Sequence, residues 1–211
     1  MRKLDKIRDL IACEAARLMY EDGVREYRDA KRKAAKRFGP EQALSLGSHL
    51  PSNAEIHEEF TKLLSSREEE LLPGRLLRLR VSALSYLELF AEFSPYLVGS
   101  VLSGAVTSQS DIDIHLFADS VEEVENLLEH RGIGFETETV AIRKGGKITD
   151  YTHVYLDDAG IVVECSVYPV AEKNNRTVSS ITGKPMERTS LKQLKKLIAA
   201  NLGEGECNGE P

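Results

Sequence analysis

The stretch that decides the fold runs from Leu97 to Ile114 and reads LVGSVLSGAVTSQSDIDI. Its end alternates polar and apolar residues with a period of two, which is typical of a half-buried strand. Because side chains two apart share a face of a strand, Asp111 and Asp113 project together, whereas Ile112 and Ile114 point into the core. Two neighbouring carboxylates repel each other unless a cation lies between them, and such oxygen ligands suit Mg²⁺ or Mn²⁺. The stretch therefore predicts a metal-binding pair of carboxylates on one face of a buried strand.

Gly99 and Ser100 precede this pair by a short interval. A glycine lets backbone N–H groups come close to a phosphate, and the serine hydroxyl adds a hydrogen-bond donor. If a helix begins here, its positive end also faces the phosphate. The alternative is that Ser100 only caps a helix.

Glu164 lies within the apolar run Ile161–Val167. An acidic residue in such a run is unfavourable unless it is paired, bound to a metal or on a solvated face. A neighbouring strand would bring it close to the aspartate pair, and three carboxylates around two cations suit in-line phosphoryl transfer. The alternative is an exposed position on an edge strand.

The whole pattern resembles the polymerase-β-like nucleotidyltransferase superfamily, especially its small, minimal members. It consists of Gly99-Ser100, ten further residues, Asp111-Ile-Asp113-Ile and an acidic residue on a later strand. The resemblance covers about residues 80–170. It implies that Gly99 and Ser100 hold the phosphates of an NTP, that Asp111 and Asp113 bind both metal ions, and that Glu164 binds the catalytic metal and helps to activate the acceptor hydroxyl. The implied cofactors are Mg²⁺ or Mn²⁺ and an NTP donor, with ATP favoured. One departure is Ser103, which stands where small members often carry a basic residue.

The pattern of the whole chain predicts an α+β fold. A helical region over residues 1–78 would offer a surface for substrate, a partner or dimerisation. A small mixed sheet flanked by helices over 79–170 would form the nucleotidyltransferase domain, and residues 171–211 would hold a loop, a C-terminal helix and a disordered tail from Gly203. The expected helices cover about 2–22, 24–38, 53–63, 75–93, 120–131 and the residues after Ser190; the expected strands cover 96–98, 111–117, 134–143, 147–156 and 161–167; loops are expected over 40–53 and 170–189.

Composition sets further limits. The net charge of −6 argues mildly against a dedicated nucleic-acid binder, although residues 1–38 hold 12 Lys and Arg against 7 Asp and Glu. Nucleic acid is therefore a possible partner that we do not favour. The cysteines Cys13, Cys165 and Cys207 are far apart and match no zinc spacing, which favours a reducing compartment. With no signal peptide and no apolar stretch long enough to cross a membrane, we expect a cytoplasmic protein without membrane contact.

These observations favour a metal-dependent nucleotidyltransferase that moves a nucleoside monophosphate from an NTP to an acceptor hydroxyl and releases pyrophosphate. The resemblance also leaves open a nucleotide-binding, antitoxin-like or other protein-interaction module with weak or no catalysis. A metal-dependent nuclease would use similar carboxylates but would not explain Gly99-Ser100. His115 shares the face of Asp113, and Lys184 and Arg188 are further candidates for contact with phosphate, although a structural or solvated role is the alternative for each.

Overall fold

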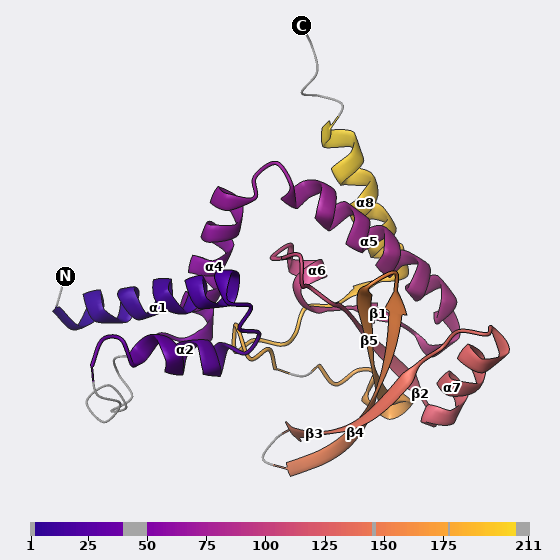
Figure 1. The fold of residues 1–211 in the computed structure, drawn as a ribbon. Helices are drawn as coiled ribbons and strands as arrows, with labels where there is room; N and C mark the ends of the chain where they lie inside the picture. The colour runs from indigo at the N-terminus through magenta and orange to yellow at the C-terminus, as the bar shows by residue number, and fades with distance from the viewer. Residues whose placement is uncertain (1–2, 40–49, 145–146, 177, 206–211) are drawn as a thin grey trace, which may run out of the picture. The chain divides into compact units, whose positions relative to one another are not determined.

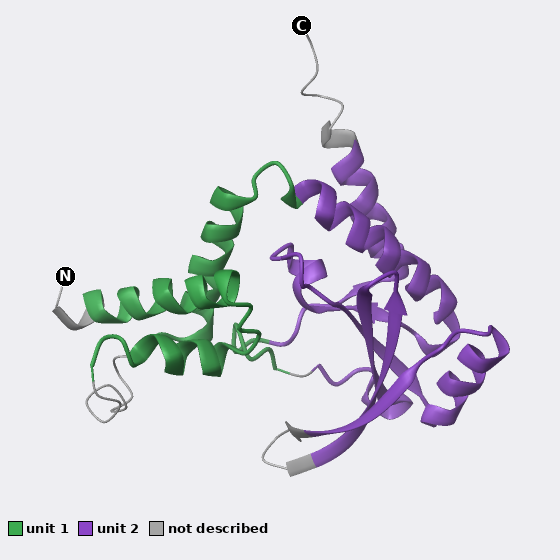
Figure 2. Cartoon of the chain, in the orientation of Figure 1, with its two compact units in different colours: residues 1–72, 178–184 green, residues 73–177, 185–211 purple. Residues whose placement is uncertain are grey.

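The computed structural model describes residues 3–39, 50–144, 147–176 and 178–205 (Figure 1). The chain forms two compact units (Figure 2). Unit 1 comprises Met1–Leu72 and Val178–Lys184, and unit 2 comprises Pro73–Thr177 and Pro185–Pro211. Most of the loop expected over 40–53, the turn at Gly145-Gly146 and the end of the tail lie outside the described residues.

The described residues of unit 1 form three helices, α1 (Lys3–Glu21), α2 (Tyr27–Ala35) and α4 (Asn53–Arg67). Apolar residues recur on one face of each helix, as an amphipathic helix requires. Several of the buried positions are alanines, so the helix backbones pack closely. The core is formed by Ile11, Ala12, Ala15, Leu18, Ala30, Ala34, Ala35 and Ile56.

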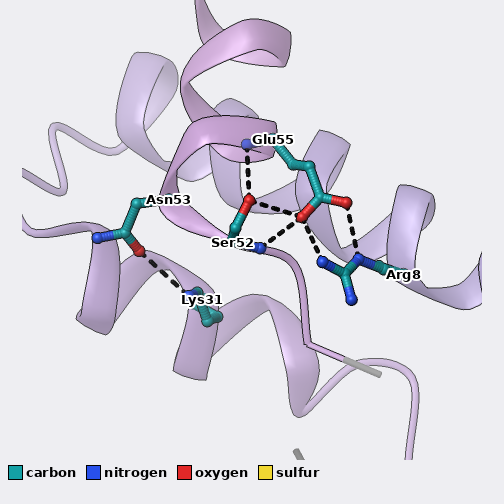
Figure 3. Close-up of polar contacts among 5 residues, drawn as sticks. All are labelled: Arg8, Lys31, Ser52, Asn53 and Glu55. Carbon is teal, nitrogen blue, oxygen red and sulfur yellow. Dashed lines mark hydrogen bonds and ion pairs between the residues drawn. The ribbon is translucent and has the colours of Figure 1, made fainter. Parts of the chain in front are cut away.

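A polar cluster joins α1 to the start of α4 (Figure 3). Ser52 is the N-cap of α4: its Oγ accepts a hydrogen bond from the Glu55 backbone N–H at 3.2 Å, and its own N–H donates to Glu55 Oε2 at 2.6 Å. Arg8 of α1 holds the same carboxylate through two hydrogen bonds of 2.7 and 2.6 Å. The Arg8 guanidinium and the Ser52 hydrogen bonds lower the pKa of Glu55 to about 2. We read this cluster as structural, because it completes a capping box and pairs its charges internally.

Unit 2 centres on a six-stranded mixed sheet with the order β3-β4-β5-β2-β1-β6. Strands β2 and β5 are parallel, and all other neighbours are antiparallel. The strands are β1 (Tyr96–Leu97), β2 (Ile112–Ala118), β3 (Glu136–Lys144), β4 (Lys147–Asp158), β5 (Ile161–Pro169) and β6 (Thr189–Ser190). The helices are α5 (Leu72–Leu89), α6 (Gly99–Ser103), α7 (Val121–His130) and α8 (Leu191–Gly205), with short 3₁₀ turns at Ala91–Phe93 and Val170–Glu172.

One face of this sheet carries the core of unit 2. The apolar residues of the alternating pattern are buried there, and they include Ile112, Ile114, Leu116, Val154, Leu156, Val163, Cys165 and Val167. Helix α5 is tied to the end of β4 by a hydrogen bond from Ser82 Oγ to Asp158 Oδ2. Helices α5 and α8 lie side by side, with Lys195 Nζ 2.7 Å from Glu88 Oε1 (Figure 1). The opposite face carries the polar members of the same strands and a second buried cluster of Phe117, Tyr151 and Tyr168.

The α+β class expected from the sequence is confirmed, and three details differ. Residues 189–190, expected to be the end of a loop and the cap of the last helix, form β6, because they pair with β1 and not because of any local pattern. The helix expected over 75–93 ends at Leu89 and is followed by a 3₁₀ turn. Residues 203–205, expected to lie in the tail, continue α8 to Gly205; glycine costs helical stability but does not prevent the helix, and proline is absent from Leu191–Gly205. Within the described residues, no helix is long and apolar enough to span a membrane.

Candidate active site

The pairing of β2 with β5 places the candidate carboxylates next to one another. In the parallel register Asp113 is the direct partner of Glu164, and Ile112 is the partner of Val163. Neighbouring strands lie about 4.7–4.9 Å apart, so the two acidic side chains leave adjacent positions on the same face of the sheet. Asp111 immediately precedes β2. The structure thus brings together three acidic residues that lie up to 53 positions apart in the sequence, from Asp111 to Glu164.

Gly99 lies directly against Asp113. A Cβ atom placed on Gly99 would be 2.0 Å from Asp113 Oδ2, far inside van der Waals contact, and the glycine has a φ of +71°. The backbone reinforces the contact, because Val98 N–H donates to the Asp113 carbonyl at 3.0 Å. A residue without a side chain is therefore required twice, for the space and for the left-handed conformation. Ser100 follows as the second residue of α6 and is partly exposed.

Arg80 of α5 holds α6 in place. Its buried guanidinium donates to the carbonyls of Val101 and Leu102 at 3.1 and 3.0 Å. These carbonyls belong to the last turns of a short helix, where backbone acceptors lack partners within the helix. Burial lowers the pKa of Arg80 from its ordinary value. Arg80 therefore positions the segment that carries Gly99 and Ser100, a role that its place in an amphipathic helix did not indicate.

The acidic cluster is electrostatically unfavourable. Burial, reinforced by the negative charges of Glu164 and Asp111, raises the pKa of Asp113 from 3.8 to about 7, and His153 opposes the shift. A carboxylate in this environment is stabilised by a cation between it and its neighbours. The donor set of Asp111, Asp113 and Glu164 thus fits a divalent cation chemically. Among the described residues, however, no three His, Cys, Asp or Glu side chains already converge on a common metal position.

His153 of β4 is a member of the site that the sequence analysis missed. Its side chain is 9% exposed, and its Nδ1 lies 2.7 Å from Glu164 Oε1. The contact is not aligned as a hydrogen bond, and both ring nitrogens are buried without a hydrogen-bond partner in the described structure. The signal that would have found His153 is the hairpin turn at Ala159-Gly160, where both residues have positive φ. That turn sets the β4–β5 register, in which His153 lies opposite Ser166, two positions from Glu164.

An aromatic and cationic pocket continues along the same face of the sheet. Farther along β2 lie His115 and Phe117, and His115 packs against the Tyr168 ring with centroids 4.8 Å apart. The Arg188 guanidinium stacks over the Tyr96 ring at 4.4 Å, and its Nε is buried without a hydrogen-bond partner among the described residues. The pocket is lined by Val98, His115, Phe117, Tyr168, Glu172, Asn175, Arg176, Met186 and Arg188.

The two basic candidates of the C-terminal segment belong to different units. Arg188 belongs to unit 2 and lines this pocket, whereas Lys184 is exposed and belongs to unit 1. Of the cysteines, Cys165 is buried beneath the site and Cys13 is exposed, and both are free thiols. Comparison of the sequence with models of protein families and with curated proteins finds no match.

Proposed function

We propose that this chain is a metal-dependent nucleotidyltransferase that transfers a nucleoside monophosphate from an NTP to an acceptor hydroxyl. The observation that carries the proposal is the placement of Asp113 and Glu164 as direct partners on parallel strands, with Asp111 beside them and Gly99 packed against Asp113. The spacing of Gly99-Ser100 and the aspartate pair in the sequence supports the same reading.

Each residue has a defined part in this reaction. Asp111, Asp113 and Glu164 would hold divalent cations, which when bound neutralise charge on the attacking and leaving oxygens. The bare backbone at Gly99 and the Ser100 hydroxyl would contact the triphosphate. A bond forms between the acceptor oxygen and the α-phosphorus as the bond from that phosphorus to the pyrophosphate oxygen breaks. Glu164 would receive the acceptor proton, and the protein would contribute mainly orientation and electrostatics.

The first test is calorimetric binding of ATP, GTP, CTP and UTP, each with Mg²⁺ and with EDTA, to the wild-type protein and to Asp111→Asn/Asp113→Asn. We expect metal-dependent binding of at least one nucleotide by the wild type and a loss of at least about 100-fold in the double variant, because two metal ligands are removed. The matched control is Asp119→Asn, an exposed acidic residue just beyond the other end of β2. It should bind nucleotide as the wild type does.

The preferred nucleotide, labelled at its α-phosphate, then tests transfer. Label that becomes attached to an added hydroxyl-bearing acceptor, together with released pyrophosphate, supports the proposal. Absence of metal-dependent binding for all four nucleotides refutes it. Equal loss of binding in the Asp119→Asn control would show that general negative charge, and not the site, is responsible.

A further inference from the structure

In the part of the chain that the structure describes, the buried imidazole of His153 has no hydrogen-bond partner, although buried polar atoms are nearly always satisfied. Its side chain is more than nine-tenths buried, and neither ring nitrogen makes a hydrogen bond within the described structure. Among the described residues its ring contact is with Tyr155, which is tilted with ring centroids 6.3 Å apart, so no close aromatic stack accounts for the burial. Nδ1 makes only the ion-pair contact with Glu164, and Nε2 has no hydrogen-bond partner in the described structure, so the imidazole has polar capacity that folding leaves unused.

The imidazole is aimed at the acidic cluster. Nδ1 lies 2.7 Å from Glu164 Oε1, and Glu164 is the strand partner of Asp113. Two ligands that bind one ion at about 2.0–2.1 Å and at right angles are about 2.9 Å from each other. The observed separation is thus close to that of two neighbouring ligands of one cation, and the two groups form an ion pair that is not aligned as a hydrogen bond.

The chemistry of the donor set changes if the imidazole is included. Carboxylates alone suit Mg²⁺ and Mn²⁺ alike, whereas an imidazole nitrogen shifts the balance toward first-row transition ions, which accept nitrogen ligands more readily than the hard Mg²⁺ ion does. We propose that His153 is a nitrogen ligand, next to Glu164, of the cation held by the acidic cluster, and that the site therefore prefers a transition-metal ion such as Mn²⁺ to Mg²⁺. This inference rests on the proposed function, because it assigns an additional ligand to the same metal site.

The test uses Mn²⁺ alone, without nucleotide, so that no base nitrogen contributes. Electron paramagnetic resonance of the full chain gives the affinity for Mn²⁺, and pulsed measurements detect ¹⁴N next to the ion. We expect coupling between Mn²⁺ and a nitrogen nucleus in the wild type, and a change in that coupling when histidine is labelled with ¹⁵N. We also expect the affinity for Mg²⁺, measured by competition, to be about 10-fold or more below the affinity for Mn²⁺. The labelled wild-type protein keeps the test valid even if a variant fails to fold.

Variants assign the nitrogen. His153→Gln should lose the coupling and bind Mn²⁺ at least about 10-fold more weakly, with a smaller preference over Mg²⁺. His115→Gln is the matched control, because His115 lies on the same face of the sheet two residues from Asp113; it should keep the coupling. Loss of the coupling in His115→Gln alone would overturn the assignment.

The remaining outcomes separate this inference from the proposed function. In one outcome Asp113→Asn abolishes Mn²⁺ binding, but the wild type shows no coupling between the ion and a histidine nitrogen. That result overturns the role of His153 and leaves the carboxylate site intact. No Mn²⁺ binding at millimolar concentration overturns both.

Discussion

Replacing Asp113 by asparagine should stabilise the metal-free protein while it removes activity. The substitution keeps the size of the side chain and removes its charge. In the wild type, burial and then the charges of Glu164 and Asp111 raise the pKa of Asp113 from 3.8 to about 7. The pKa of Asp113 thus rises by about 3, and each pKa unit is worth 1.36 kcal/mol. The folded state is therefore destabilised by roughly 4 kcal/mol when the carboxyl is ionised in both the folded and the unfolded state.

The sign of the pH dependence follows from the raised pKa. The folded state prefers the protonated carboxyl, so its stability is fully present below pH 3.8 and is lost as the pH rises through about 7. Asp113→Asn does not titrate and escapes this loss. Because the site relaxes and admits water, 4 kcal/mol is a ceiling, and we expect a gain of about 2–4 kcal/mol at pH 8 that shrinks steadily toward pH 4.

Urea unfolding in EDTA at several pH values measures the gain. Tyrosine fluorescence reports mainly on the unit that holds the site, since five of the seven tyrosines lie there, at positions 86, 96, 151, 155 and 168. The exposed Asp119→Asn is the control and should change stability little. A variant that is no more stable than the wild type at pH 8, or a gain that does not depend on pH, would refute the electrostatic description of the cluster.

Two further substitutions test particular contacts. Gly99→Ala places a methyl group 2.0 Å from Asp113 Oδ2 at a φ of +71°. We expect the variant to lose about 1–3 kcal/mol of folding stability through strain. We also expect metal-dependent nucleotide binding to weaken by about 10-fold or more. Gly160→Ala has a similarly positive φ of +88° but no atom within 4 Å, so it should lose stability and keep binding; equal binding losses in the two variants would contradict the contact. Glu55→Gln removes a carboxylate whose pKa is lowered to about 2, so its stabilisation is present above pH 4.5 and is lost as the pH falls toward 2. Because that side chain is 40% exposed, solvent screening limits the loss of folding stability in Glu55→Gln to about 1 kcal/mol at pH 7. Thermal melting measures this loss. A loss that persists at pH 2 would argue against the ion pair and cap as its source.

Local periodicity was enough to predict most of the helices and strands. The alternation over residues 111–117 placed two aspartates on one face of a strand, and the helical spacing of apolar residues in 2–22 indicated α1. Both patterns depend on the geometry of a single element, and the structure has these elements at nearly the expected residues. The short strand β6 escaped prediction, because two residues are too few to carry a period and their pairing with β1 is a contact across the chain.

For the candidate site, the sequence by itself determined the residue types and the local faces: a glycine and serine before a strand that presents Asp111 and Asp113 together. Only the tertiary structure decided which strand lies beside that one. The parallel pairing of β2 with β5 made Glu164 the partner of Asp113, the close approach of Gly99 showed why no side chain fits there, and the β4–β5 register brought His153 into the cluster. The physical reason is that side-chain direction follows from local backbone geometry, whereas the choice of neighbouring strand depends on the burial of the whole apolar face and on connections that span many residues.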